Sequence, residues 1–102
     1  MENLLQNLQR TIRALETLSE KGIPESDRVD ELLDQFFQQK IDLVNLNPTT
    51  SSALYQQAAQ ALGNAAARAE KIAKDPSHFR DIVPTLNDAI GKLAKLLNQL
   101  AV

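Results

Sequence analysis

The sequence predicts an all-α fold: an antiparallel up-down-up-down four-helix bundle that forms a single domain over residues 1–102. Three observations favour this fold. Apolar residues recur at spacings of three and four, and prolines divide the chain into stretches of similar length. Aromatic residues make up only 4% of the chain. The core must therefore be built from Leu, Ile, Val and Ala, which suits helices better than sheets.

The expected joins between helices lie at three X-Pro steps. These steps are Ile23-Pro24, Asn47-Pro48 and Asp75-Pro76. Proline is favoured at the first position of a helix, because the missing N–H is not needed there. Asn47 and Asp75 are expected to act as N-caps. Gly22 is expected to end the first helix, since glycine readily adopts the left-handed conformation of a helix C-terminus.

The apolar stripe of each segment has helical spacing. The first segment carries Leu5, Leu8, Ile12, Leu15 and Leu18. The second has a broader apolar face: Val29, Leu32, Leu33, Phe36, Phe37, Ile41 and Val44. The third, from about Ser51 to Lys74, is rich in alanine. The fourth repeats every seven residues: Val83, Leu86, Ile90, Leu93, Leu97 and Leu100.

Pro84 lies inside the fourth segment and cannot occupy a normal interior helix position. We expect this helix to begin near Asp81, which places Pro84 in the first turn, where no amide is missed. Residues 76–80 would then form a short turn or a 3₁₀ piece. The alternative is a kinked helix that begins at Pro76.

Composition excludes several classes of protein. The net charge of −2, from 11 basic and 13 acidic residues, and the lack of a basic stripe argue against nucleic-acid binding. With no cysteine, disulfides, thiolate zinc sites and cysteine nucleophiles are excluded. No apolar run approaches the ~20 residues that cross a bilayer, and the first residues do not resemble a signal peptide. We therefore expect a cytoplasmic protein without membrane insertion.

No arrangement of residues indicates catalysis. His78 is the only histidine, so a His–His metal pair cannot form, and a solvated loop histidine is the interpretation we favour. The three glycines are isolated from one another, so no phosphate-binding loop is present. No nucleophile elbow of the form G-x-S-x-G exists either. We expect no enzyme activity, no cofactor and no metal.

Acidic residues gather near the start of the second helix. They are Asp27, Asp30, Glu31 and Asp34. A solvated face is the interpretation we favour, and contact with a basic partner is the alternative. A cation site is disfavoured, because calcium sites usually draw oxygens from a tight loop containing glycine. Phe36 and Phe37 lie about 100° apart on a helix, so only one should point into the core, and Phe37 is assigned to a contact surface.

The third helix carries small residues beside its core stripe. They are Ala59, Gly63, Ala66, Ala67 and Ala73. Small side chains let helix axes approach closely. The flank either packs against a neighbouring helix of the same bundle or forms a groove for a helix from another chain.

These features favour a non-enzymatic interaction module: a small helical adaptor, chaperone-like or regulatory protein. Such a module would form a homodimer or dock a partner helix. The residues expected to bind the partner are Phe37, Ala59, Gly63, Ala66, Ala67, Asp27, Asp30, Glu31 and Asp34. The alternative is a sensor or carrier that holds a small apolar ligand inside the bundle.

Overall fold

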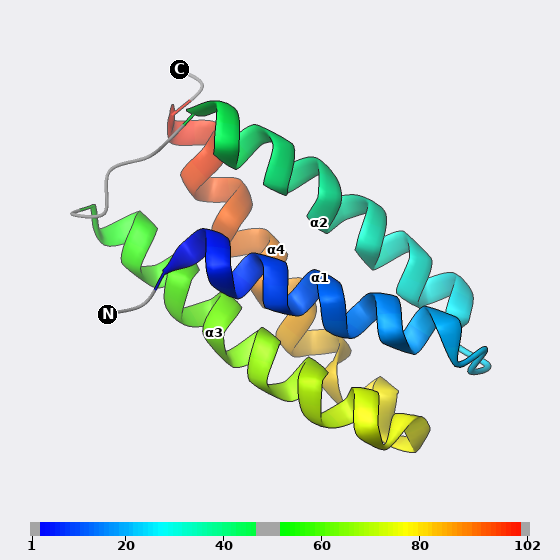
Figure 1. Cartoon of the computed structure of the whole chain (residues 1–102). Coiled ribbons are helices and arrows are strands. Elements are labelled where there is room, and N and C mark those ends of the chain that lie inside the picture. The colour runs from blue at the N-terminus through cyan, green and yellow to red at the C-terminus, as the bar shows by residue number, and fades with distance from the viewer. Residues whose placement is uncertain (1–2, 47–51, 101–102) are drawn as a thin grey trace.

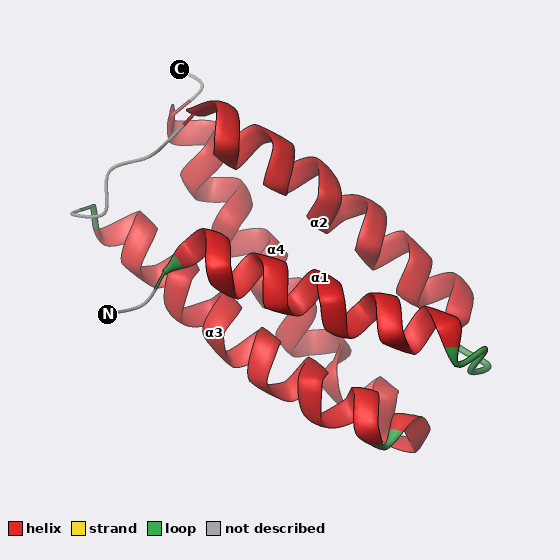
Figure 2. Ribbon diagram, in the orientation of Figure 1, coloured by secondary structure: helices red, strands yellow, loops and turns green. Residues whose placement is uncertain are grey.

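The computed structural model describes residues 3–46 and 52–100, which form helices and turns without a β-strand (Figures 1 and 2). The helices are α1 (Leu4–Glu20), α2 (Ser26–Leu46), α3 (Ala53–Lys74), the 3₁₀ helix η1 (Pro76–His78) and α4 (Phe79–Leu100). Figure 1 shows that consecutive α-helices run in opposite directions. The expected all-α, four-helix bundle is confirmed.

The order of the helices around the bundle differs from the simplest arrangement. α1 packs against α2 and most extensively against α3, while α4 packs against α2 and α3. Helices α2 and α3 follow one another in the chain and yet lie diagonally across the bundle. A simple up-down-up-down bundle would have placed them side by side. As a consequence, two neighbouring pairs are parallel: α1 with α3, and α2 with α4.

Hydrogen bonds join the helices within each parallel pair. Tyr55 accepts a bond at its hydroxyl from the backbone N–H of Leu4, and Asn7 Nδ2 donates to the Ala59 carbonyl at 3.3 Å. The two bonds lie about one helical turn apart on each helix and follow in the same order, so α1 and α3 run in the same direction. On the other side of the bundle, Gln39 Nε2 of α2 donates to the Ile90 carbonyl of α4 at 3.0 Å.

All four α-helices contribute to one aliphatic core. Its largest fully buried side chains are Phe36, Phe79, Leu4, Leu8, Leu15, Leu18, Leu32, Leu62, Leu86, Leu93, Leu96 and Val29. The radius of gyration, 13.1 Å, equals the ~13 Å of a compact chain of this length. Phe36 is fully buried whereas its neighbour Phe37 is exposed, which confirms that only one of the two points into the core.

The helix ends are set by local chemistry. Gly22 has φ +63° and donates its N–H to the Ser19 carbonyl at 3.3 Å, which confirms the expected glycine stop of α1. Ser52, rather than Asn47, caps α3 by accepting a bond from Tyr55 N–H at 2.9 Å. The Asn47-Pro48 step itself lies outside the described residues.

Helix α4 begins at Phe79, two residues before the expected start near Asp81. The Phe79 side chain is buried in the core, and this burial favours the earlier start. Pro84 is therefore the sixth helical residue and cannot donate to the carbonyl of Arg80. Residues 76–78 form the expected 3₁₀ piece, which leads directly into the α-helix that begins at Phe79.

Candidate interaction surfaces

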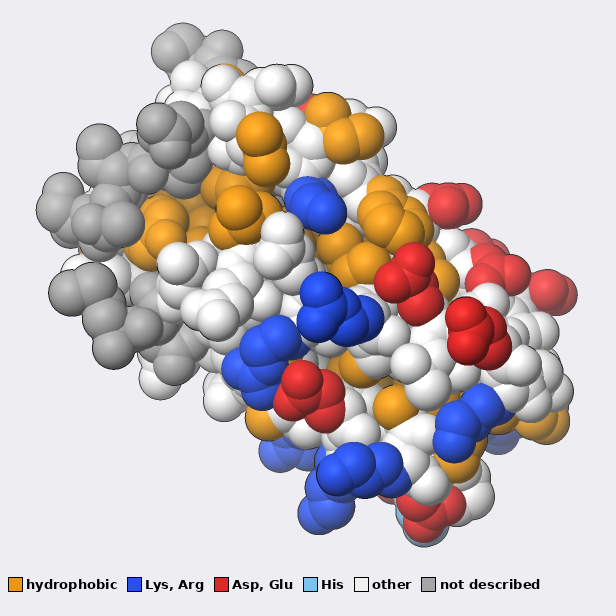
Figure 3. All heavy atoms as spheres, viewed as in Figure 1, with side chains coloured by type: hydrophobic (Ala, Val, Ile, Leu, Met, Phe, Trp, Pro, Cys, Tyr) orange, Lys and Arg blue, Asp and Glu red, His pale blue; other side chains and the backbone are white. Residues whose placement is uncertain are grey.

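The outer face of α2 carries large hydrophobic side chains that the bundle leaves uncovered. Phe37 is 39% exposed, Ile41 56% and Val44 57%. With Lys40 and Asn45 they line an open cleft of about 330 Å³. Figure 1 shows that α1 and α2 lie close together at the turn that joins them and diverge toward the other end. The second half of α2 has hydrophobic side chains on the surface (Figure 3).

The same face of α2 is acidic in its first half. Asp27, Asp30 and Asp34 are all exposed, and they precede Phe37, Ile41 and Val44 at spacings of three and four. We call these six residues the α2 stripe. They lie along one side of the helix because this spacing keeps side chains in line. The stripe is therefore acidic at one end and apolar at the other.

The acidic residues at the start of α2 are exposed, and whether they contact a basic partner stays a prediction. Asp30 Oδ1 accepts a bond from Ser19 Oγ at 2.8 Å, which holds the start of α2 beside the end of α1. Glu31 Oε2 lies 3.1 Å from Arg28 Nη1 on the same helix. Within the described residues, no group of three or more acidic or histidine side chains is placed to hold a metal ion.

The small-residue flank of α3 is not a surface groove. Ala59 and Ala66 are buried in the chain's own core, and the Ala59 carbonyl accepts the bond from Asn7 of α1. The expectation that these two residues contact a partner is therefore corrected. Their small side chains serve the close approach of α1 to α3. Gly63 is half-buried, and only Ala67 is exposed.

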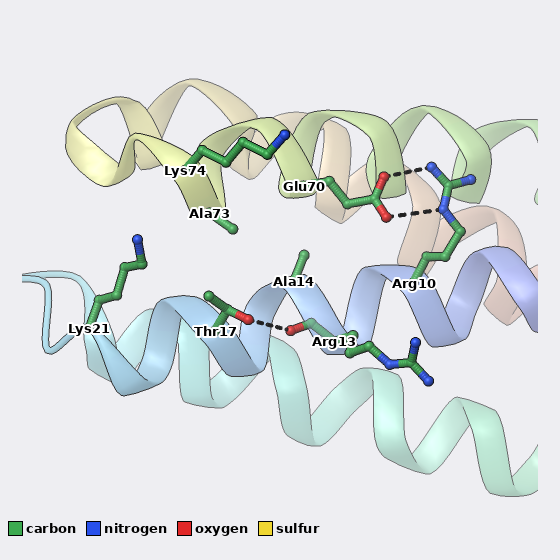
Figure 4. Close-up of a pocket in the computed structure, with 8 residues that line it drawn as sticks. All are labelled: Arg10, Arg13, Ala14, Thr17, Lys21, Glu70, Ala73 and Lys74. Carbon is green, nitrogen blue, oxygen red and sulfur yellow. Dashed lines mark hydrogen bonds and ion pairs between the residues drawn. The ribbon is translucent and has the colours of Figure 1, made fainter.

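A second cleft, of about 590 Å³, lies between α1 and α3 and has a basic rim. We call it the basic cleft; it is lined by Arg10, Arg13, Ala14, Thr17, Lys21, Glu70, Ala73 and Lys74. Figure 4 shows Arg10 and Glu70 pointing toward one another across it, while Arg13 extends away from α3. The surface view shows basic side chains gathered over α1 and α3, and acidic ones toward the start of α2 (Figure 3).

Arg10 and Glu70 form a two-point ion pair inside the basic cleft. The Nη2–Oε1 distance is 2.6 Å and the Nε–Oε2 distance is 3.2 Å. Hydrogen bonding to Arg10 lowers the pKa of Glu70 below its usual value. The positive charges of Arg10 and Lys74 act in the same direction, and desolvation opposes them. Glu70 is thus a carboxylate that the cleft already holds in its charged form.

The single histidine of the chain lies at the surface beside a carboxylate. His78 Nδ1 lies 3.6 Å from Asp81 Oδ2, and both side chains are exposed. A third cleft, of about 400 Å³, lies between α3 and α4. All three clefts open at the surface, so none is the enclosed pocket that the ligand-carrier alternative requires, and that alternative stays a prediction. No described helix is both long and apolar enough to cross a membrane.

The basic cleft was not predicted from the sequence. Arg10, Arg13 and Lys21 lie off the apolar stripe of the first helix, and Lys74 ends the third. Their positions in the sequence indicated only that these basic residues lie outside the core. Their convergence depends on α1 lying beside α3, whereas the simplest bundle places the first and third helices diagonally.

Comparison with known proteins adds no assignment. The chain matches no protein-family model, and neither the curated proteins nor the solved structures contain a significant match.

Proposed function

We propose that the chain is a non-enzymatic interaction module that docks an amphipathic helix of a partner protein along the α2 stripe. The observation that carries the proposal is the exposure of Phe37, Ile41 and Val44 in line on a helix whose opposite face is already in the core. Helix-in-groove recognition uses anchors at this spacing.

The α2 stripe also suggests the chemistry of the docked helix. Its apolar half would pack against apolar side chains, and its acidic half would face Lys or Arg. A partner helix that is apolar at one end and basic at the other therefore complements the stripe along its whole length.

Two copies of the stripe complement one another poorly. In a parallel pair, Asp30 and Asp34 of one copy would meet the same residues of the other, and like charges repel. In an antiparallel pair with full overlap, the aspartates would face Phe37, Ile41 and Val44 and be desolvated without a partner. Self-association is thus restricted to a short overlap around Ile41. For this reason the proposal commits to a different protein as the occupant.

The test uses two synthetic helical peptides of about three heptads, with Leu at the contact positions of one half and Lys at those of the other. One peptide begins with the Leu half and the other with the Lys half, because the orientation of docking is open. Fluorescence anisotropy of the labelled peptides measures binding. We expect one of them to bind, and Ile41→Glu to weaken binding about ten-fold or more.

The matched control is Gln35→Glu, which adds the same charge at an exposed position of α2 outside the stripe. It should change the affinity far less than Ile41→Glu does. Equal losses in the two variants, or no binding of either peptide, would refute the proposal. Analytical ultracentrifugation supplies the other decisive outcome: a stable homodimer that Ile41→Glu dissociates would make a second copy the occupant and overturn the choice of a different protein.

A further inference from the structure

We propose that the basic cleft between α1 and α3 binds a carboxylate-rich segment of another protein, at a site separate from the α2 stripe. Four basic side chains and one acidic side chain line the cleft. Within the described part of the chain, Arg13 and Lys21 make no ion pair. The cleft therefore holds an excess of positive charge that Glu70 alone does not balance.

The Arg10–Glu70 pair shows how the basic cleft could bind a carboxylate of a partner protein. Arg10 holds the Glu70 carboxylate through two hydrogen bonds, the fork-like geometry that guanidinium groups favour with carboxylates. At the other end of the cleft Lys21 points toward α3, whereas Lys74 extends along α3 toward Glu70 (Figure 4), and its charge helps to lower the pKa of Glu70. A carboxylate of the partner placed between the two lysines would be attracted by both ammonium groups.

The floor of the cleft suits a peptide side chain. Ala14 and Ala73 lie between the charged residues (Figure 4), and their methyl groups can pack against the methylenes of a glutamate. The volume of about 590 Å³ lies within the ~300–1,000 Å³ usual for binding pockets. The cleft thus combines a charged rim with an apolar base.

The surroundings favour an acidic protein segment over a nucleic acid. The chain has a net charge of −2, and acidic side chains gather toward the start of α2 on the same face as the cleft (Figure 3). A long polyanion would therefore be repelled beyond the cleft. The lining contains no aromatic side chain on which a base could stack.

The lysines also have a role that needs no ligand. Lys21 and Lys74 stand at the C-terminal ends of two parallel helices, where the helix dipoles place partial negative charge and cations are stabilising. A loss of stability on removing them would not distinguish the two roles. The experiment must accordingly measure binding.

The probe is a fluorescein-labelled helical peptide of Glu and Ala, with a Gln-and-Ala peptide of equal length as the reference. We expect the full chain to bind the Glu peptide in fluorescence anisotropy, and binding to weaken steeply between about 50 and about 300 mM salt, because exposed charges are screened. The double variant Lys21→Gln/Lys74→Gln should weaken binding about ten-fold or more. The double variant Lys92→Gln/Lys95→Gln, on α4, lowers the net charge equally and should change the affinity less than about three-fold.

Equal losses in the two double variants would show attraction by net charge alone and would overturn the proposal. So would equal binding of the Gln peptide, or tighter binding of inorganic polyphosphate or single-stranded DNA than of the Glu peptide. Amide shifts in NMR spectra of the unaltered chain give a readout free of folding artefacts. Shifts at Ala14, Thr17 and Ala73 on addition of the Glu peptide support the site, and shifts confined to other helices refute it. Ile41→Glu should leave binding of the Glu peptide unchanged. The proposal for the basic cleft therefore does not depend on the proposal for the α2 stripe.

Discussion

Arg10 of α1 and Glu70 of α3 face each other across the basic cleft and join the parallel pair of helices through two hydrogen bonds. The side chains are 41% and 45% exposed, so water screens much of the attraction between them. Arg10 also donates from Nη1 to Asn7 Oδ1 at 3.2 Å. The pair is thus linked to Asn7, whose Nδ2 in turn bonds the Ala59 carbonyl. One network therefore runs from the rim of the cleft to the α1–α3 contact.

The first prediction concerns the strength of this pair. A double-mutant cycle with Arg10→Ala and Glu70→Ala should give a coupling energy below about 1 kcal/mol, the usual range for exposed ion pairs. Arg10→Ala should cost more stability than Glu70→Ala, because it also removes the bond to Asn7. Urea unfolding of the four proteins measures these energies. A coupling energy well above 1 kcal/mol would mean that the pair is far less screened than its exposure indicates.

The second prediction concerns pH. The pKa of Glu70 is lowered in the folded chain, chiefly by hydrogen bonding to Arg10. The resulting stabilisation is therefore fully present above the unfolded pKa of about 4.3 and is lost as the pH falls through the lower, folded pKa. Glu70→Gln should make the free energy of unfolding less dependent on pH in that acidic range. Glu16→Gln on exposed α1 surface is the control for charge, and a flattening equal to that of Glu70→Gln would contradict the assignment.

The third prediction compares two glycines that differ in backbone conformation. Gly22 has φ +63°, and Gly91 lies inside α4; a Cβ added at either position would meet no atom of the described residues within 4 Å, apart from its neighbours in the chain and the backbone of its own helix. Only backbone conformation therefore differs. Gly91→Ala should stabilise the chain by up to about 1 kcal/mol through helix propensity. Gly22→Ala should destabilise it by about 1 kcal/mol, because alanine is strained in the left-handed region. The midpoints of urea unfolding should move in opposite directions, and a shift of the same sign would contradict this account.

The number, type and limits of the helices could largely be predicted from periodicity and punctuation. Leu8, Leu15 and Leu86 are buried where their spacing places them, and Gly22 ends α1 through its positive φ. The start of α4 was missed by two residues, because burial of Phe79 outweighed the local preference of Pro84 for a first turn. Local sequence does not contain that tertiary contact.

The surfaces were harder to predict, because they depend on which helices are neighbours. Phe37 was identified correctly as lying outside the core, since adjacent residues cannot both face inward. Ala59 and Ala66 were assigned to a partner although both are buried, and the Ala59 carbonyl accepts a bond from Asn7 of α1. The same unforeseen pairing of α1 with α3 brings Arg10 to Glu70 and creates the basic cleft. Periodicity gives the buried face of a helix and leaves open which helix covers it.

The fourth prediction tests this revised role of the α3 flank. Ala66 is buried and Ala67 is exposed on the same helix. Ala66→Leu should destabilise the chain by about 1–3 kcal/mol, because extra methyl groups overpack a filled core. Ala67→Leu should change stability by less than about 0.5 kcal/mol. Thermal unfolding followed by circular dichroism measures both. If Ala66→Leu were tolerated as well as Ala67→Leu, the interpretation of this flank as an outward-facing surface would be restored.

The fifth prediction concerns a polar side chain buried between the other parallel pair. Gln39 of α2 donates from Nε2 to the Ile90 carbonyl of α4, but its buried Oε1 has no hydrogen-bond partner among the residues that the structure describes. Replacing the amide nitrogen and oxygen of Gln39 by apolar atoms of similar shape removes one hydrogen bond of modest strength. It also removes the cost of desolvating the unpaired oxygen. Gln39→Met should therefore leave stability unchanged or raise it by up to about 1 kcal/mol.

Gln39→Glu is the contrasting variant at the same position. It places a carboxylate beside the Ile90 carbonyl, removes the donor and desolvates a charge, so it should destabilise the chain by more than about 2 kcal/mol near neutral pH. Chemical unfolding of both variants, at pH values on either side of the carboxyl titration, measures these effects. A loss of more than about 2 kcal/mol in Gln39→Met would show that the amide contributes more than its bond to Ile90. In that case polar contact, rather than aliphatic packing, would align α2 with α4.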